Sequence, residues 1–210
     1  MSAVDVKGPI LLRQLDDLLS PVECADMLRR ADGIQDDVLS NVAWHPCRNA
    51  MYDQVVMVDQ ALAAKLWRRV QPYVPTKYGG YHLLYLNSYF RFSRYPPGGY
   101  FPMHLDGCNE DKHASGETTC AYFTLNIFLN DDFDGGHTDF FNKMKGEKKP
   151  RFSVQPKTGR AALFWSAQPH RGNRVTRGTK YLLRTDVMGI LHPTPAQLER
   201  IAAATPKYSE

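Results

Sequence analysis

The chain has 210 residues, of which 43% are hydrophobic and 23% are charged, a composition typical of a globular protein. A chain of this length can bury a core without disulfides or a structural metal, so we expect a single domain over residues 1–210. The net charge of +4 permits an acidic partner but does not demand one, and because the sequence has no defined nucleic-acid motif, nucleic acid is an unlikely partner.

Neither the cysteines nor the apolar segments indicate a secreted or membrane protein. Cys24, Cys47, Cys108 and Cys120 form no CxxC pair, so we expect neither a zinc knuckle nor a redox dithiol. No basic start is followed by an apolar run, and no run approaches the roughly 18 apolar residues of a membrane span. The sequence therefore predicts a soluble protein of a reducing compartment, the cytoplasm, with no membrane partner.

The N-terminal third predicts a short strand and two helices. The apolar run 9–14 is typical of a strand. A capping box then predicts a helix through about residue 30, with Ser20 as N-cap, Pro21 at the first helical position and Glu23 at the third. A second helix is expected from Asp59 to about residue 72, and 44–49 between the helices reads as loop-like or extended. The helices, over about 16–72, should form a supporting layer against a sheet.

From Tyr81 onward the sequence changes to short β-rich runs that are divided by Gly, Pro, Asn and Asp. The expected strands are 81–86, 89–95, 100–105, 120–129, 138–141, 151–155, 161–165 and 181–188. Eight short strands of this kind predict a mainly β fold, a two-sheet jelly roll over about 81–190 with the helices in support. A last short helix is expected after Thr194, where a capping residue and a proline recur.

The stretch 94–107 holds an imidazole and a carboxylate two residues apart, at His104 and Asp106. On an extended strand, alternate side chains project to the same side. Two His and one carboxylate on one face of a metal, with other positions open, is the ligand set of non-haem Fe(II) oxygenases. A third ligand should come from another strand, and His170 is the best candidate.

Further motifs follow in a characteristic order. They are a strand, an acidic turn with a Gly pair and a second strand over 128–141, a turn and an apolar strand over 156–165, then His170 and the run 180–187. Together with His104 and Asp106, these motifs resemble the Fe(II)- and 2-oxoglutarate-dependent dioxygenases, specifically the prolyl 4-hydroxylase-like branch, over roughly residues 85–190. The resemblance implies a double-stranded β-helix that uses Fe²⁺, 2-oxoglutarate and O₂.

The resemblance also implies individual roles. His104, Asp106 and His170 match the three iron ligands, and Lys180 matches the basic residue that pairs with the distal carboxylate of 2-oxoglutarate. Tyr95 and Thr138 match positions that hydrogen-bond the same co-substrate. Lys180 and Arg184 share one face of the last strand, so Arg184 is a rival partner for that carboxylate. The spacing in the family favours Lys180.

Three other side chains, those of Asn126, Arg174 and Arg177, each allow two interpretations. Asn126, a polar residue in an apolar strand, lines the site or is a satisfied core amide. Arg174 and Arg177, which flank His170 in sequence, bind an acidic substrate or pair with nearby carboxylates. The basic loop 143–151 is best read as a solvated hairpin tip.

We therefore expect a 2-oxoglutarate-dependent dioxygenase that hydroxylates a C–H bond of a prolyl or other amino-acid side chain and releases succinate and CO₂. A free amino acid or small metabolite is the alternative substrate. Demethylation of nucleic acid and a non-catalytic metal-binding jelly-roll module are the remaining alternatives. The sequence does not identify the primary substrate.

Overall fold

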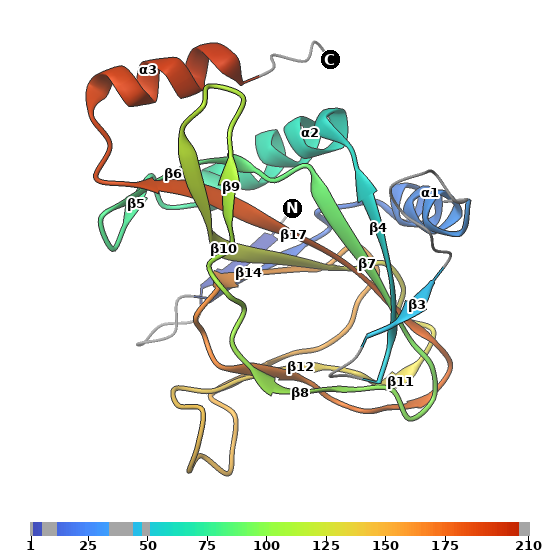
Figure 1. Cartoon of the computed structure of the whole chain (residues 1–210). Coiled ribbons are helices and arrows are strands. Elements are labelled where there is room, and N and C mark those ends of the chain that lie inside the picture. Colours follow the sequence, from blue (N-terminus) through green and yellow to red (C-terminus); the bar gives the residue numbers. More distant parts are fainter. Residues whose placement is uncertain (1, 6–11, 34–43, 48–50, 206–210) are drawn as a thin grey trace.

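The computed structural model describes residues 2–5, 12–33, 44–47 and 51–205. Two antiparallel sheets face each other, and the helices lie outside the larger one (Figure 1). The predicted jelly roll with supporting helices is confirmed. Among the described residues, no helix has both the length and the apolar character needed to cross a membrane.

The larger sheet contains 11 strands. Its main path runs through β1 (Ser2–Asp5), β2 (Leu12–Asp16), β14 (Ala161–Trp165), β10 (Thr118–Phe128), β17 (Lys180–Leu191), β7 (Tyr89–Tyr95), β4 (Asp53–Val58) and β3 (His45–Pro46). Beside this path, β6 (Tyr81–Leu86) pairs with β17 and with β5 (Lys77–Tyr78), and β9 (Glu110–Lys112) pairs with β10. The long central strands β10 and β17 are buried along most of their length, and β17 buries the charged residues Lys180 and Asp186 as well as apolar ones.

The smaller sheet has four strands in the order β13 (Phe152–Val154), β12 (Thr138–Phe140), β15 (His170–Gly172) and β8 (Phe101–His104). A separate two-stranded ribbon joins β11 (Asp134–Gly135) to β16 (Val175–Arg177). An apolar cluster that includes Phe128, Phe140 and Phe164 fills the space between the two sheets. The side chains of the site, described below, lie against this cluster.

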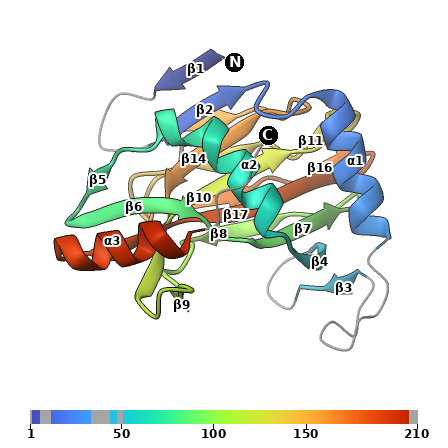
Figure 2. The same cartoon turned by 90° about the horizontal axis from the view of Figure 1, so that it is seen from above.

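The helices α1 (Pro21–Asp32), α2 (Gln60–Val70) and α3 (Pro195–Ala204) and the 3₁₀ turn η1 (Gln71–Tyr73) complete the chain, and Figure 2 shows α1 and α2 across the larger sheet. The predicted capping box is present, because Ser20 Oγ accepts a hydrogen bond from the Glu23 backbone. Asp59 caps α2 by accepting from the Leu62 backbone. Leu66 and Val70 are fully buried against the sheet, so these helices support the jelly roll from outside the site.

Most predicted strands are confirmed, and those at 81–86, 89–95 and 161–165 have the predicted bounds. The strand expected at 9–14 is found at Leu12–Asp16, while residues 9–11 lie outside the described part. The strand β4 was not predicted, and neither were the short strands β9, β11, β15 and β16. These short strands are defined by pairing with distant segments, which periodicity over a few residues does not reveal.

The cysteines depart from the sequence analysis. Cys108 and Cys120, 12 residues apart, form a disulfide between the segment after β8 and the start of β10, with a Cα–Cα distance of 5.7 Å. The sequence did not predict this bond. Spacing alone could not predict it, since the hairpin of β9 and β10 brings the two residues together.

Candidate active site

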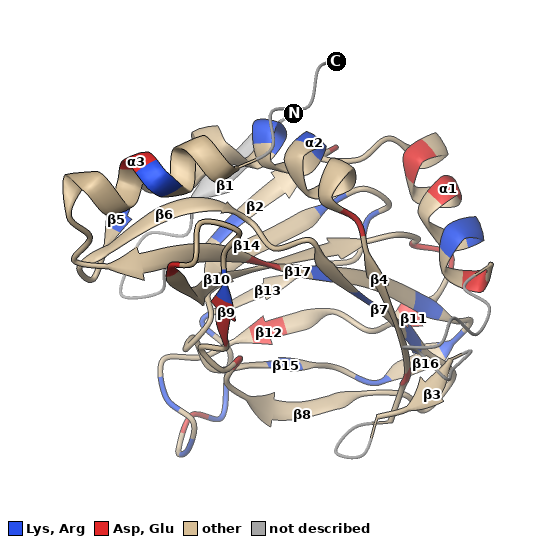
Figure 3. Cartoon of the chain, turned by 45° about the horizontal axis from the view of Figure 1, so that its top comes forward, with Lys and Arg blue, Asp and Glu red and all other residues tan. Residues whose placement is uncertain are grey.

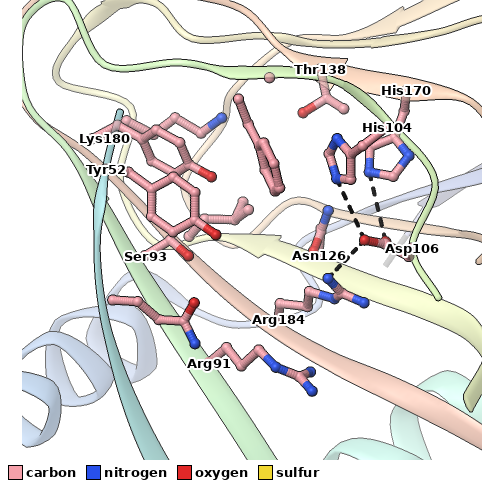
Figure 4. A pocket seen from close by; sticks show the side chains of 15 residues that line it. Tyr52, Arg91, Ser93, His104, Asp106, Asn126, Thr138, His170, Lys180 and Arg184 are labelled. Carbon is pink, nitrogen blue, oxygen red and sulfur yellow. Dashed lines mark ion pairs between the residues drawn. The ribbon is translucent and has the colours of Figure 1, made fainter. Parts of the chain in front are cut away.

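Three metal-ligating side chains meet where the two sheets converge. His104 ends β8 and lies directly opposite His170 on β15, and Asp106 follows two residues after His104. One ligand atom from each residue lies within 4.8 Å of the other two, and this His-Asp-His group is the only such cluster of three or more found among the described residues. The structure thus brings together the three residues that the sequence predicted as iron ligands (Figure 4).

Backbone carbonyl groups fix both imidazole rings. His104 Nδ1 lies 2.9 Å from the Pro102 carbonyl oxygen, and His170 Nδ1 lies 2.8 Å from that of Gln168. A carbonyl oxygen only accepts, so each Nδ1 carries the proton and each Nε2 keeps its lone pair. Burial lowers the pKa of His170 to about 4, so this ring is neutral at neutral pH. Both rings are therefore ready to bind a metal through Nε2.

The Asp106 carboxylate is held by donors on the larger sheet. Thr124 Oγ1 donates to Oδ2 at 2.7 Å, and Arg184 Nη1 lies 2.7 Å from Oδ1. Burial alone would raise the pKa of Asp106, but opposing causes, of which the charge of Arg184 is the largest, lower that pKa. Asp106 is thus an oriented anion, which is the form that ligates a divalent cation.

Lys180 is a buried cation without a carboxylate partner among the described residues. Its side chain is 1% exposed, and the one hydrogen bond found for its ammonium group is donation to the Gly136 carbonyl oxygen at 2.6 Å. Nζ also lies 4.9 Å from the ring centroid of Tyr95 and 5.2 Å from that of Phe128. Desolvation lowers the pKa of Lys180 to about 7. This environment suits an anionic ligand that would compensate the charge.

Gly136 makes room for Lys180. Its φ of +62° is a conformation that glycine adopts without strain, and a Cβ there would lie 3.1 Å from Lys180 Cδ and 2.7 Å from a ring carbon of Phe133. The second glycine of the Gly135-Gly136 turn therefore lets its backbone approach the lysine. This glycine pair belongs to the order of motifs that resembles the family. The close approach of Lys180 explains why the second position is a glycine.

Arg184, the rival for the co-substrate carboxylate, is already paired. Besides its contact with Asp106, Nη2 donates to Asp186 Oδ1 at 3.2 Å. Arg91 Nη1 contacts the other oxygen of Asp186 at 2.9 Å, so charges alternate from Arg91 to Asp106. Arg184 Nε is buried and has no hydrogen-bond partner. The geometry thus gives Arg184 a place beside the metal ligand and leaves Lys180 as the uncompensated cation.

A cavity of about 180 Å³ connects these groups. Among the residues predicted for the site, Tyr95, Asn126, Thr138, Lys180, Arg184 and the three candidate metal ligands line it. Asn126 lies directly opposite Arg184 in the sheet, and its Oδ1 is buried without a partner. Tyr95 lies directly opposite Lys180. The fold therefore gathers eight of the ten predicted residues around one space.

Sequence reasoning missed four polar residues of this cavity, namely Tyr52, Gln54, Arg91 and Ser93. Gln54 and Ser93 lie opposite each other on β4 and β7. The Tyr52 ring is 4.6 Å from that of Tyr95, between centroids. Arg91 and Ser93 alternate with the core residue Phe92 on a predicted strand, and this polar alternation was the signal that could have found them.

Arg174 and Arg177, for which the sequence allowed either substrate binding or pairing with carboxylates, do not line the cavity. Arg174 donates to the Gly98 carbonyl oxygen at 2.7 Å and its guanidinium lies 4.7 Å from the Tyr100 ring centroid. Arg177 pairs with the exposed Asp134 at 2.6 Å. Arg177 lies in the ribbon of β11 and β16 and Arg174 directly precedes it, so closeness to His170 in sequence does not place either side chain in the cavity.

The basic loop projects from the smaller sheet between β12 and β13, and Figure 3 shows its Lys and Arg residues in blue. Lys143, Lys145, Lys148 and Lys149 are exposed, as is Arg151. None of them lines the cavity. This arrangement agrees with the reading of the loop as a solvated hairpin tip.

The His-Asp-His group is the ligand set of non-haem Fe(II) oxygenases, and comparison with known families found a match to part of the chain. Residues 90–185 match the family model of the 2OG-Fe(II) oxygenase superfamily, and this segment contains every candidate metal ligand. The predicted resemblance to 2-oxoglutarate-dependent dioxygenases is confirmed, and with it the cofactors Fe²⁺, 2-oxoglutarate and O₂. The residues present fit these groups, since the Nε2 atoms of both histidines face a carboxylate and a buried ammonium lacks an anion among the described residues.

Among curated proteins, this chain is similar to prolyl 3-hydroxylase 2 of mouse, with 34% identity over 110 residues. The match covers 49% of this chain and 15% of that protein, so it concerns one part of a much longer relative.

Solved structures of prolyl hydroxylases share the fold. A viral collagen prolyl hydroxylase of Paramecium bursaria Chlorella virus 1, solved with 2-oxoglutarate, has a TM-score of 0.54 and 18% identity, covering 85% of this chain and 96% of that one. A Pseudomonas putida prolyl 4-hydroxylase has a TM-score of 0.57 and 18% identity, covering 84% and 91%. A Trichoplax adhaerens prolyl hydroxylase, solved with a hypoxia-inducible-factor peptide, has a TM-score of 0.59 and 15% identity, covering 93% and 87%.

Proposed function

We propose that this protein is a hydroxylase that uses Fe(II), 2-oxoglutarate and O₂ to oxidise an unactivated C–H bond, releasing succinate and CO₂. The observation that carries the proposal is the buried, uncompensated Lys180 in the same cavity as His104, Asp106 and His170. A non-catalytic metal-binding module has no need of a buried cation for a second ligand. When bound, the metal and co-substrate supply the oxidising chemistry, which protein side chains cannot provide.

The chain's own residues bind and orient these groups. His104, Asp106 and His170 would hold the iron on one side and leave its other positions open. Lys180 would pair with the distal carboxylate of 2-oxoglutarate. The surrounding ring of Tyr95 keeps water from this contact, which strengthens it.

Three cavity residues would complete the binding of the co-substrate and the substrate. Tyr95 and Thr138 offer hydroxyl groups close to Lys180 and to the candidate metal ligands, respectively. Asn126, whose Oδ1 lacks a partner, would accept a hydrogen bond from the substrate. Arg184 would keep Asp106 oriented instead of binding 2-oxoglutarate directly.

We propose a peptide substrate and hydroxylation of a prolyl or other amino-acid side chain. Support comes from the prolyl hydroxylases of similar fold, one of which was solved with a peptide fragment. A free amino acid or small metabolite remains the alternative. No nucleic-acid motif favours demethylation, and the basic loop lies outside the cavity.

The cytoplasmic location expected from the sequence stays a prediction.

A screen of peptides and metabolites for stimulated succinate release tests the proposed function. Wild-type protein with Fe(II), ascorbate and 2-oxoglutarate should form succinate slowly without substrate and faster with the right one. Zn²⁺ in place of Fe²⁺ should give none, since zinc has no redox chemistry. Equal succinate formation with either metal, or none with iron under any condition, would refute the hydroxylase.

A further inference from the structure

One wall of the cavity has no role in holding the metal or the co-substrate. It is formed by Gln54 on β4 and Arg91 on β7. In the sheet, Arg91 lies opposite Arg184, whereas Tyr95 lies opposite Lys180. Four residues along a strand correspond to about 13 Å, so this wall begins well away from the lysine. Figure 4 shows Arg91 and Lys180 in separate parts of the cavity.

The side chains of this wall have hydrogen-bond donors that are available to a ligand. Arg91 uses Nη1 on Asp186, and its side chain is 23% exposed. Gln54, which is partly buried, has no side-chain hydrogen bond to any other residue of the described chain. A guanidinium presents a planar fork of donors that matches a carboxylate, and an amide adds one more donor.

The charges around the cavity favour an anion at this wall. Lys180, Arg91 and Arg184 are cationic, whereas Asp106 lines the cavity as an anion and Asp186 bridges the two arginines from behind. The charge of Fe²⁺ and that of the 2-oxoglutarate dianion cancel. The loaded site therefore keeps an excess of about one positive charge, which attracts a carboxylate and repels an ammonium group.

We propose that Gln54 and Arg91 bind a carboxylate of the primary substrate, so that the protein selects substrates that carry a carboxylate at this position. This inference rests on the proposed function and specifies its substrate class. The carboxylate belongs either to an Asp or Glu side chain close to the hydroxylated residue in a peptide, or to the α-carboxylate of a free amino acid. Both sources offer the same planar anion to the arginine fork.

Binding without turnover tests this proposal. Wild-type protein loaded with Fe(II) and 2-oxoglutarate under argon is titrated calorimetrically with matched pairs of ligands. One pair is a proline-containing peptide with Glu or with Gln beside the proline, and the other is free proline or its amide. In the pair that binds, the carboxylate form should bind about tenfold or more tightly, because a charge-assisted hydrogen bond is lost in the amide.

Variants of Arg91 then test whether this residue causes the preference for the carboxylate form. Arg91→Gln should bring the acid-to-amide ratio close to one, and Arg91→Lys should retain part of it because the charge remains. The ratio within one variant cancels any general loss of binding. Arg177→Gln removes the same charge from a surface arginine outside the cavity and should leave the ratio unchanged.

The outcomes separate this inference from the proposed function. An acid-to-amide ratio near one in wild-type protein, a preference for a Lys-containing peptide, or an unchanged ratio in Arg91→Gln would overturn the carboxylate subsite while succinate formation still supports a hydroxylase. Failure of the wild-type protein to form succinate with iron would overturn both. The pair that responds identifies the peptide or the amino acid as the source of the carboxylate.

Discussion

At the scale of single residues, Lys180 is the side chain whose surroundings say most about the ligand of the cavity. An ammonium group is costly to bury without an anion, and in this cavity a carbonyl oxygen and two aromatic rings are its neighbours. The lowered pKa, about 7, expresses that cost. A bound dicarboxylate would restore the charged form, so binding of 2-oxoglutarate should be coupled to uptake of a proton.

This coupling predicts a pH dependence of 2-oxoglutarate affinity. Below pH 7 Lys180 is protonated before binding and the affinity should be flat. Above pH 7 the free protein has lost that proton, so the Kd should rise by up to about tenfold for each pH unit. Tyr95, the titratable ring beside Lys180, has a raised pKa and stays neutral in this range.

Lys180→Arg is the matched variant, because a guanidinium remains charged throughout this range. Its affinity should be lower at pH 7 but should not show the added rise above pH 7. Calorimetric titration with 2-oxoglutarate at pH 6 to 9, in buffers of different ionisation enthalpy, measures both affinity and proton uptake. Identical pH profiles for the two proteins would exclude Lys180 as the titrating group.

The choice between Lys180 and Arg184 gives a second prediction at this scale. Removal of one partner of a buried ion pair costs about 3–5 kcal/mol, so Lys180→Ala should weaken 2-oxoglutarate binding by roughly 10²–10³. Iron binding should change little. Arg184→Ala, measured at saturating iron, should have the smaller effect on 2-oxoglutarate and the larger effect on iron, since it frees Asp106. The reverse order would make Arg184 the anchor.

How far the sequence predicts the site is clear from these two residues. Strand periodicity was enough to place His104 and Asp106 on one face, whereas the roles of His170 and Lys180 were implied by the resemblance to the family. The sequence could not exclude Arg184 as the partner of the 2-oxoglutarate carboxylate. Its own partners, Asp106 and Asp186, come within reach only in the folded sheet. Arg174 and Arg177 were considered for the site because they are close to His170 in sequence. In the folded chain, their side chains contact Gly98 and Asp134 instead.

At the scale of elements, β10 is the strand that connects the metal group to the rest of the protein. It carries Thr124, which donates to Asp106, and begins beside Cys120, which is bonded to Cys108. The segment that holds Asp106 is thus tied to β10 at the carboxylate itself and again at Cys108, two residues later. These constraints limit the positions that the ligand can adopt.

Cys108→Ser should therefore weaken both the fold and the metal site. A disulfide that closes a loop of about this length stabilises a protein by roughly 2–3 kcal/mol. The melting temperature should fall by several degrees, and the Kd for Fe(II) should rise. Reductant should reproduce the effect in wild-type protein but not in the variant. Unchanged melting and iron binding in the reduced wild type would leave the disulfide without a structural role.

The strand β4 shows where reading the sequence element by element fails. Its apolar run 55–58 is only four residues long, and its pairing with β7 joins segments more than 30 residues apart. Helices with capping boxes were predicted well because their signals are local. A short strand depends on its partner, so Gln54, and with it one wall of the cavity, was not anticipated.

At the scale of the whole molecule, the site is shared between the two sheets. His104, Thr138 and His170 come from or follow the smaller sheet, whereas Asn126, Lys180 and Arg184 come from the larger one. Separation of the sheets would disperse the ligands. Folding and formation of the site should therefore be one event.

Calorimetry tests this expectation, and with it the single domain predicted for residues 1–210. Thermal unfolding should show one cooperative transition, and Fe(II) with 2-oxoglutarate should raise its midpoint, because ligands that bind only the native state stabilise it. Two transitions, with the added ligands shifting only one of them, would show that the supporting helices and the jelly roll unfold separately.

The most direct test of the account is succinate formation from 2-oxoglutarate by wild-type protein and by His104→Ala. His104 suits this purpose better than Asp106, whose loss would leave the buried Arg184 without its nearest counter-charge. The account predicts iron-dependent succinate from the wild type and only background from the variant, with similar melting temperatures. Succinate formation by His104→Ala at the wild-type rate would contradict the metal site on which the whole proposal rests.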